Sequence, residues 1–294
     1  MKYQVTQNEE GMRLRDVLRQ SMGMSYTAMK SAKWDGRILV NQSPRTVDQP
    51  VHVGEWIEVL DKEALPVYSL TPCYRPVSIA YEDDDLWIID KPAPLASQSS
   101  ERQSDDTLEN MLYAHLGCPA NFIYRPVNRL DKGTSGLMVV AKTAHAQYRL
   151  QRLLHTDEFK RTYLAITEGT PEVPQGIIDA PIAKEDAASI KRVIDPTGKP
   201  SITHYQVLES NGHRSLIRLQ LETGRTHQIR VHLAYLGCPI CGDFLYGQEL
   251  PELPGRFALH SEEVLLHHPI TGEWLTIKSL LPAELRRLLD PAHP

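Results

Sequence analysis

The chain has 294 residues, of which 41% are hydrophobic, and its formal net charge at pH 7 is −5. This length is about twice the usual domain size and predicts two domains with a sizeable core. There is no apolar run of about 18 residues and the first ten residues are polar, so we expect no membrane span, no signal peptide and a cytoplasmic protein. The acidic balance excludes a uniformly basic nucleic-acid coat protein, but a local basic surface can still bind RNA.

Residues 1–61 are predicted to form a small α/β unit. The periodicity indicates a helix over 11–20, a second helix from an N-cap at Ser25 to Gly36, and strands over 37–41 and 54–60. Between residues 11 and 45, seven basic side chains stand against two acidic ones, which gives this stretch a net charge of +5. Such a cluster is either a solvated helical face or a nucleic-acid surface. The residues considered for RNA contact are Arg13, Arg15, Arg19, Lys30, Lys33 and Arg37.

Residues 62–76 contain three prolines and no periodic pattern, so we predict a linker there, followed by a larger domain over 77–294. In this domain we predict helices over 105–116, 143–155 and 226–236, with Ser104 or Asp105 capping the first of them. Strands are expected over 86–90, 123–127, 136–141, 161–168, 203–208 and 215–221. Hairpin-like strand pairs mixed with isolated helices predict an α+β fold around a mostly antiparallel mixed sheet, flanked by helices and loops.

The segment 129–136 is the first place where polar residues exceed what folding needs. Gly133 and Gly136 permit sharp turns, while Thr134 and Ser135 can bond the freed amides or a carboxylate. An aspartate held in such a segment, here Asp131, can serve as a nucleophile or a base. Spacing alone favours the alternative, an aspartate that only satisfies turn amides.

Two further segments are candidates for chemistry. Tyr163 shares a strand face with Arg161 and is either a core residue or a platform on which a base stacks. The segment 223–232 places Arg225, His227 and Arg230 at a predicted helix start, where the helix dipole and cationic donors suit a carboxylate or phosphate partner. An ordinary surface helix with salt bridges is the competing interpretation.

No metal or nucleotide cofactor is expected. Cys238 and Cys241 lack a second ligand pair at zinc spacing, so we interpret them as small packing residues. The twelve histidines are dispersed without ligand spacing, which disfavours a metal-dependent hydrolase. Neither a phosphate-binding Walker loop nor a dinucleotide glycine fingerprint is present in the sequence.

Several sequence blocks together resemble the RluA family of RNA pseudouridine synthases. The central signature of that family is His-Arg-Leu-Asp-x-x-Thr-Ser-Gly, and this chain has Asn128-Arg-Leu-Asp131-Lys-Gly-Thr-Ser-Gly136. Further blocks match in the family's order from about residue 80 to 282. They include Asp85-Leu-Trp-Ile-Ile-Asp-Lys-Pro92, Arg161-Thr-Tyr163-Leu-Ala, Thr223-Gly-Arg-Thr-His-Gln-Ile-Arg230 and Gly242-Asp-Phe-Leu-Tyr-Gly247. Residues 11–60 resemble the S4-type (alpha-L) RNA-binding module that often precedes this catalytic domain, which favours RNA contact for the +5 stretch.

The resemblance implies specific roles. Asp131 would be the catalytic nucleophile, Arg230 its ion-pair partner, and Tyr163 the residue that stacks on the target base and assists proton removal from carbon 5. Arg129 would fill the gap left by a uridine that flips out, while Arg225 and His227 would contact RNA. Asn128 stands where the family usually has His and Arg161 where Lys is common, so we expect altered local geometry rather than lost activity.

The expected function is isomerisation of specific uridines in structured RNA, with 23S ribosomal RNA as the preferred target and transfer RNA as the alternative. A non-catalytic RNA-binding assembly factor of the same fold is the remaining possibility. We expect RNA to be the partner and the protein to be a monomer. We expect no membrane association, no cofactor and no metal.

Overall fold

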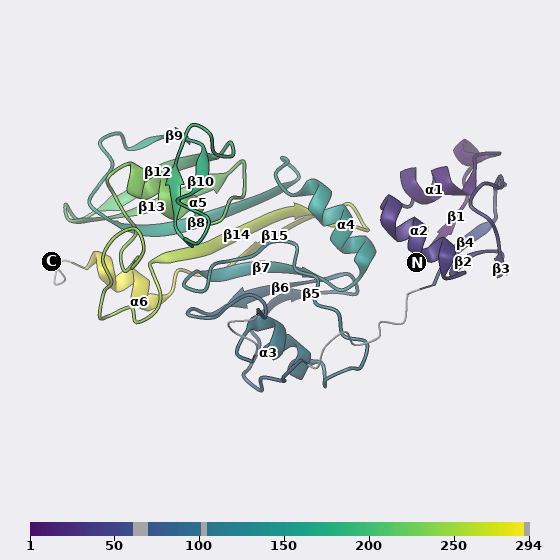
Figure 1. Cartoon of the computed structure of the whole chain (residues 1–294), viewed down its shortest axis with the longest axis horizontal. Helices are drawn as coiled ribbons and strands as arrows, with labels where there is room; N and C mark the ends of the chain where they lie inside the picture. Colours follow the sequence, from purple (N-terminus) through teal and green to yellow (C-terminus); the bar gives the residue numbers. More distant parts are fainter. Residues whose placement is uncertain (61–69, 101–104, 291–294) are drawn as a thin grey trace.

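The computed structural model describes residues 1–60, 70–100 and 105–290 (Figure 1). Residues 62–69 of the predicted linker lie outside this range, and residues 70–76 contain no helix or strand. Among the described residues, no helix is both long and apolar enough to cross a membrane.

Residues 1–60 form a small unit with its own sheet and its own core. The sheet order is β1-β4-β2-β3, with β1 at Lys2–Gln4, β2 at Ile38–Val40, β3 at Ser43–Pro44 and β4 at Trp56–Val59. Helices α1 (Leu14–Gln20) and α2 (Tyr26–Trp34) pack on it, and a single turn of 3-10 helix spans Gln7–Glu9. The predicted cap is present, because the Ser25 side chain accepts a hydrogen bond from the Ala28 amide at 3.1 Å. The buried core of this unit includes Leu14, Val17, Leu18, Ile38 and Ile57.

The larger part is built on a nine-stranded sheet in the order β5-β6-β7-β14-β8-β13-β12-β9, with β15 paired to β14. Its strands are β5 (Ile79–Glu82), β6 (Leu86–Lys91), β7 (Ser135–Ala141), β8 (Phe159–Glu168), β9 (Gln175–Asp179), β12 (Ile202–Ser210), β13 (Arg214–Leu221), β14 (Leu259–His267) and β15 (Trp274–Lys278). All pairs are antiparallel except β7 with β14. A separate hairpin joins β10 (Ile182–Lys184) to β11 (Arg192–Ile194). The fold is therefore α+β around a mostly antiparallel mixed sheet, as the sequence predicted.

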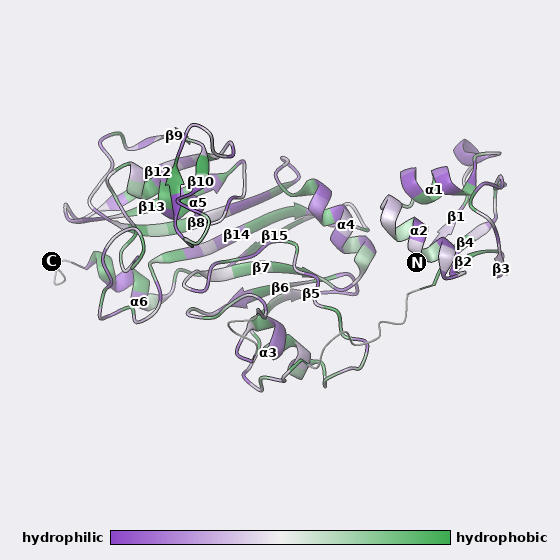
Figure 2. Cartoon of the chain, in the orientation of Figure 1, coloured by the Kyte–Doolittle hydropathy of each residue, from purple (hydrophilic) through white to green (hydrophobic). Residues whose placement is uncertain are grey.

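Strands β6 and β7 are buried on both faces, which the two-residue alternation of a strand explains. Trp87 and Ile89 of β6 join the larger core, whereas Leu86 and Ile88 join a second core on the opposite face. Helix α3 (Leu108–His115) contributes to the larger core and α4 (Ala144–Leu153) to the second one. Figure 2 shows the central strands as predominantly hydrophobic and α4 with a hydrophilic outer side. Two helices thus seal a sheet whose strands carry apolar residues on both sides.

The remaining helices are short. Helix α5 spans Gln228–Tyr235 and α6 spans Ala283–Arg286, followed by a 3-10 turn at Arg287–Leu289. Gly117 and Gly237 lie just beyond the ends of α3 and α5 with φ values of 75° and 76°, in the left-handed conformation that glycine adopts most readily. Both predicted helix ends are confirmed.

Three local predictions were wrong. The segment 123–127 is not a strand, and only Pro126 forms an isolated bridge, with Val140. Helix α3 is capped by Thr107, whose hydroxyl accepts the Asn110 amide at 3.3 Å, rather than by Asp105 or by Ser104, which lies outside the described residues. Helix α5 begins after His227 instead of at Thr226.

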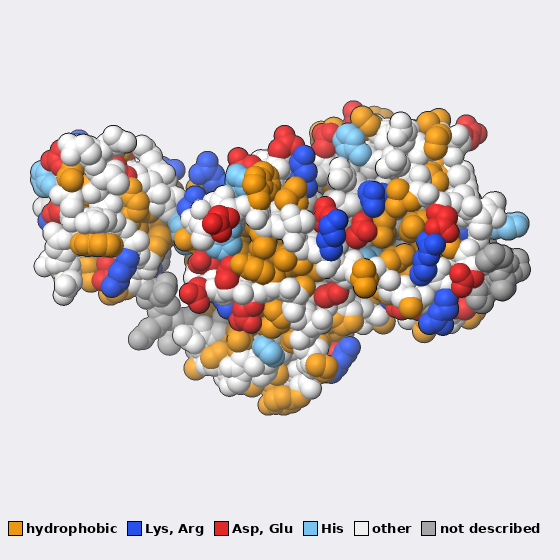
Figure 3. Space-filling view, turned by 180° about the vertical axis from the view of Figure 1, so that it is seen from behind, with side chains coloured by type: hydrophobic (Ala, Val, Ile, Leu, Met, Phe, Trp, Pro, Cys, Tyr) orange, Lys and Arg blue, Asp and Glu red, His pale blue; other side chains and the backbone are white. Residues whose placement is uncertain are grey.

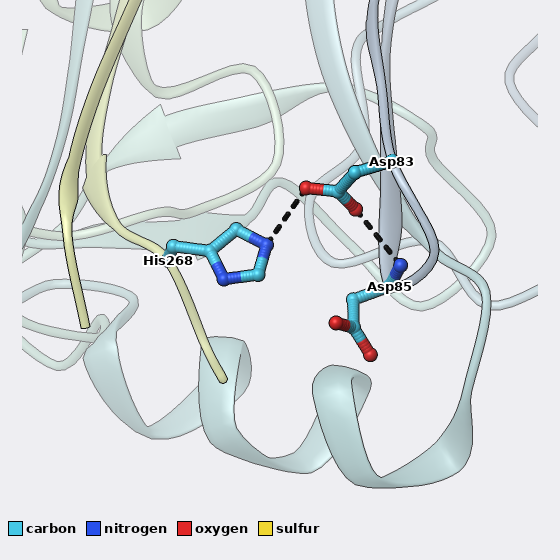
Figure 4. Close-up of side chains that lie close together, drawn as sticks. All are labelled: Asp83, Asp85 and His268. Atoms are coloured by element: carbon cyan, nitrogen blue, oxygen red, sulfur yellow. Dashed lines mark hydrogen bonds and ion pairs between the residues drawn. The ribbon is translucent and has the colours of Figure 1, made fainter. Parts of the chain in front are cut away.

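A polar cluster ties the β5–β6 turn to the β14–β15 turn (Figure 4). Asp83 accepts hydrogen bonds from the Tyr81 hydroxyl at 2.7 Å, the Leu86 amide at 2.9 Å and the His268 Nε2 at 2.8 Å. The other ring nitrogen of His268 accepts the Thr271 amide at 3.1 Å. Asp83, Asp85 and His268 bring ligand-type atoms within 4.8 Å of one another, but both nitrogens of the imidazole are already engaged in this clamp. We interpret this polar cluster as structural, because its hydrogen bonds hold the two turns together.

Candidate active site

The segment that leads to Asp131 runs beside β7 and then leaves it. The Val127 amide donates to the Val139 carbonyl at 2.9 Å, and the Val139 amide donates to the Asn128 Oδ1, also at 2.9 Å. The side chain of Asn128 therefore takes the place of a backbone acceptor at the point where the pairing ends. This contact gives Asn128 a structural role at the position where the resembled family usually has His.

The Asp131 turn is fixed from both sides. The Ser97 hydroxyl donates to the Leu130 carbonyl at 2.6 Å and accepts the Leu130 amide at 3.2 Å, while the Leu95 amide donates to the Lys132 carbonyl at 2.9 Å. The Thr134 amide closes the turn by donating to the Asp131 carbonyl at 3.0 Å. A carboxylate on a turn held by four hydrogen bonds is preorganised for chemistry.

The two glycines of the segment 129–136 have different structural roles. Gly136 has φ of 101°, and a Cβ there would lie 2.3 Å from the Ser261 carbonyl oxygen. Gly133 has no left-handed conformation, but a Cβ there would lie 2.6 Å from the Phe257 ring. The turn itself lies at residues 132–133, so the prediction of a sharp turn is correct for Gly133, where the missing Cβ also lets the Phe257 ring pack closely. Gly136 lies within β7, where it allows close approach of the Ser261 backbone.

A buried lysine supports the neighbouring loop. The Lys91 side chain is fully buried, and its Nζ donates to the carbonyls of Pro92 at 3.0 Å and Leu95 at 2.8 Å. Burial lowers the pKa of Lys91 to about 7. The ammonium group bonds the start of the loop that carries Leu95 and Ser97. Because Leu95 and Ser97 in turn bond the Asp131 turn, Lys91 stabilises that turn indirectly.

Arg230 lies between two carboxylates. Its Nη1 is 3.2 Å from the Asp131 Oδ2, and its Nε and Nη2 form a two-pronged contact with Asp243 at 2.7 and 2.8 Å. The guanidinium carbon also lies 4.2 Å from the centre of the Phe257 ring, within the range of a cation–π contact. Burial works against this charge, but Asp243 and then Asp131 hold the pKa of Arg230 above its ordinary value. The predicted pairing of Arg230 with Asp131 is present, and Asp243 holds the arginine in place.

Six residues singled out in the sequence line one cavity of about 600 Å³, namely Asp131, Tyr163, Arg230, Arg129, Arg225 and His227. Tyr163 lies on β8 and is 4% exposed, and Arg161 lines the same cavity two residues earlier. The cationic lining residues are Arg129, Lys132, Arg161, Arg225 and Arg230. Asp131 is the one acidic side chain among the described lining residues. This cavity is strongly cationic in a protein whose net charge is negative.

The six basic residues proposed for RNA contact near the N-terminus lie in the small unit and do not line the cavity. Arg15 pairs at 2.9 Å with Asp48, which lies outside the stretch and neutralises part of its +5 charge, whereas Asp35, which pairs with Arg37 at 3.2 Å, is already counted in that charge. Arg13, Arg19, Lys30 and Lys33 have exposed side chains. On the face shown in Figure 3, basic and acidic side chains of the described residues are interspersed rather than gathered into one basic area.

Sequence reasoning missed two residues of the site. Asp243 is completely buried against Arg230, and the Tyr246 hydroxyl lies 2.9 Å from the Nδ1 of His227. Both belong to the block Gly242-Asp-Phe-Leu-Tyr-Gly247, which was matched to a family without a role for either residue. The signal was present, but an isolated acid in such a block does not reveal its partner. Cys238 and Cys241 are buried free thiols, consistent with packing residues.

The chain is similar to known proteins over most of its length. The profile of the family described as RNA pseudouridylate synthase matches residues 85–235. An RNA pseudouridine synthase of Bacillus subtilis, YhcT, is 35% identical over 97% of this chain and 94% of its own length. Ribosomal large subunit pseudouridine synthase D of Vibrio cholerae is 38% identical over 89% of this chain and 85% of its own length.

Similarity extends to solved structures. The human protein named RNA Pseudouridylate Synthase Domain Containing 4 superposes with a TM-score of 0.58 and 27% identity, covering 72% of this chain and 92% of the human chain. A family match over half of the chain, together with relatives that match over nearly its whole length, establishes the relationship. The chain belongs to the RluA family of RNA pseudouridine synthases, enzymes that isomerise uridine in RNA.

Proposed function

We propose that this enzyme isomerises specific uridines of large-subunit (23S) ribosomal RNA, with Asp131 as its nucleophile. The observation that carries the proposal is a single carboxylate, on a rigid turn, among five cationic side chains of one cavity. Phosphates of RNA suit such a lining, and the carboxylate is left to react with the nucleoside. Relatives named ribosomal large subunit pseudouridine synthase D support the choice of RNA.

The reaction needs no cofactor. The bond from ribose carbon 1′ to uracil nitrogen 1 breaks, the base rotates, and a bond from carbon 1′ to carbon 5 forms. Carbon 5 then loses its proton and nitrogen 1 gains one, so atoms and electrons balance. A carboxylate assists by attack at the sugar, by attack at carbon 6 of the base, or by formation of a glycal, and all three routes use Asp131 in the same place.

The other cavity residues take separate roles in this proposal. Arg230 keeps Asp131 ionised and oriented, since a charged donor favours the carboxylate form. Tyr163 stacks on the target base and assists removal of the proton from carbon 5. Arg129 is exposed at the cavity and occupies the space that the flipped uridine leaves, offsetting part of the cost of unstacking.

The small N-terminal unit is proposed to be an S4-type RNA-binding module. It has a separate sheet and core, and four of its exposed cations (Arg13, Arg19, Lys30 and Lys33) lie on or next to helices α1 and α2. A module of this kind adds affinity for a large folded RNA without touching the chemistry.

Mapping pseudouridines in RNA from a strain that lacks the gene tests the target. We expect one or more pseudouridines to disappear from 23S ribosomal RNA and to return when the wild-type gene, but not its D131N variant, is restored. Loss confined to transfer RNA would replace the proposed target. An unchanged pseudouridine map would favour a non-catalytic assembly factor.

A further inference from the structure

We propose that His227, oriented by Tyr246, is a positioning residue that fixes the Asp131 carboxylate for attack. This inference rests on the proposed role of Asp131 as the nucleophile. In this proposal His227 acts on the nucleophile Asp131, whereas the sequence had suggested that His227 contacts RNA.

The histidine is held between two partners. Its Nδ1 lies 2.9 Å from the Tyr246 hydroxyl oxygen, and its Nε2 lies 3.9 Å from the Asp131 Oδ2. The rings of His227 and Tyr246 meet edge to face with centroids 5.7 Å apart. The His227 side chain is 14% exposed, so its orientation is set by protein contacts rather than by solvent.

Hydrogen bonding assigns the proton on the ring. The Tyr246 oxygen accepts the Arg192 backbone amide at 2.8 Å. The Nε2 faces the Asp131 carboxylate, where an unprotonated ring nitrogen would be repelled, so the single hydroxyl proton of Tyr246 goes to the His227 Nδ1. The neutral imidazole therefore carries its proton on Nε2, which faces Asp131. Burial, Arg230 and Arg192 hold the pKa of His227 below its ordinary value, while the charges of Asp131 and Asp243 act in the opposite direction.

The two donors near Asp131, on Arg230 and His227, face the same carboxylate oxygen. Arg230 Nη1 is 3.2 Å and His227 Nε2 is 3.9 Å from Oδ2. Within the described parts of the chain, no hydrogen bond to Oδ1 is present, which leaves that oxygen to face the substrate. At 3.9 Å the Nε2 lies beyond hydrogen-bond distance from Oδ2, and we expect this gap to close when substrate binds, as catalytic contacts often tighten then. A neutral second donor fixes direction without adding a second positive charge that would weaken the nucleophile.

The backbone at His227 is itself unusual. Its φ of 59° and ψ of 17° lie in the left-handed region, which asparagine adopts more readily than most residues other than glycine. If the role of His227 is only to adopt this backbone conformation at the start of α5, asparagine is a better replacement than glutamine. The two amide residues also mimic different ring atoms, since asparagine reaches the position of Nδ1 and glutamine reaches that of Nε2. Glutamine therefore keeps a donor toward Asp131, while asparagine keeps only the contact with Tyr246.

The test compares H227N, H227Q and Y246F in the full-length protein. The probe is unmodified 23S ribosomal RNA, transcribed in vitro with tritium on carbon 5 of uridine, and the readouts are kcat, KM and melting temperature. We expect H227Q to keep kcat within about tenfold of wild type and H227N to lose about 100-fold, with KM and melting temperature little changed. Y246F, which frees the ring proton to move, is expected to lose about tenfold in kcat.

The ranking of the variants decides the proposal. A kcat for H227N equal to or above that for H227Q would overturn it, because a structural role alone predicts that order. If either histidine variant fails to fold, an unchanged kcat in Y246F would overturn it instead. D131N separates the two proposals, because turnover by D131N removes the role of Asp131 itself, whereas inactive D131N with equal H227N and H227Q removes only the role of His227.

Discussion

The Asp131 cavity and the small N-terminal unit both gather positive charge, but the cavity holds part of this charge on buried side chains. In the cavity, the Arg230 side chain is 4% exposed and is fixed by carboxylates on two sides. In the N-terminal unit, Arg13, Arg19, Lys30 and Lys33 project from the surface. A buried charge is costly unless it is paired, whereas an exposed one costs little and is screened by salt.

This contrast separates two kinds of function. The buried cations of the cavity, Arg161 and Arg230, are built into the fold, so their removal is expected to change stability and rate together. Charges of the N-terminal unit are expected to change RNA affinity alone. Substitutions in both regions test that division.

Asp131→Asn is expected to lower turnover by several orders of magnitude, as for other lost nucleophiles. The amide keeps the shape of the carboxylate but is a far poorer nucleophile. Melting temperature and RNA affinity should stay close to wild type, because the turn is held by backbone and Ser97 contacts rather than by the carboxylate. Multiple turnover by a pure sample of this variant would remove Asp131 from the mechanism.

Arg230→Ala is expected to damage both fold and activity. It leaves Asp243, which is completely buried, without its two-pronged partner, and removal of one member of such a pair costs roughly 3–5 kcal/mol. Arg225→Ala is the matched control, since Arg225 lines the same cavity but is exposed. It should weaken RNA binding and leave the melting temperature unchanged. Equal melting temperatures and equal rates for both variants and wild type would show that burial does not distinguish these arginines.

Tyr163→Phe should bind RNA almost as well as wild type, because the ring keeps its stacking surface, worth ~1–3 kcal/mol per base. Loss of the hydroxyl should slow tritium release from carbon 5 by about 100-fold if it assists proton transfer. Single-turnover release measured beside equilibrium binding separates the two effects. Equal release rates would leave Tyr163 as a stacking platform only.

A chain that starts near Lys62 is expected to fold, keep the Asp131 site and bind its RNA more weakly. Each lost phosphate contact should reduce the log–log salt dependence of binding by roughly 0.7–0.9. Charge reversal at Arg13, Lys30 and Lys33 in the full-length protein should reproduce much of this effect. Removal of both Arg15 and Asp48 by alanine is the comparison, because this pair is neutral as a whole and its loss leaves the net charge unchanged. Full affinity and an unchanged salt slope in the shortened chain would make the +5 stretch a solvated face.

The two regions also differ in what their sequence revealed. The order of the motifs predicted that Asp131, Tyr163 and Arg230 belong to one site, and all three line the same cavity. Short apolar runs predicted β6 and β7, because a strand that is buried on both faces carries apolar residues at successive positions. The pairing of Arg230 with Asp243 was not predicted, since it depends on how the segment after α5 folds back onto that helix. For the same reason the sequence did not predict β14, β15 or the left-handed start of α5 at His227.

The most direct test of the account is tritium release from natural RNA. RNA from a strain that lacks the gene, grown with uridine tritiated at carbon 5, contains every target in its unmodified form. We predict that the purified wild-type protein, with chelator present and no added cofactor, releases tritium to water and forms one pseudouridine for each tritium lost. D131N should release none. Absence of release by wild type, or equal release by D131N, would contradict the account.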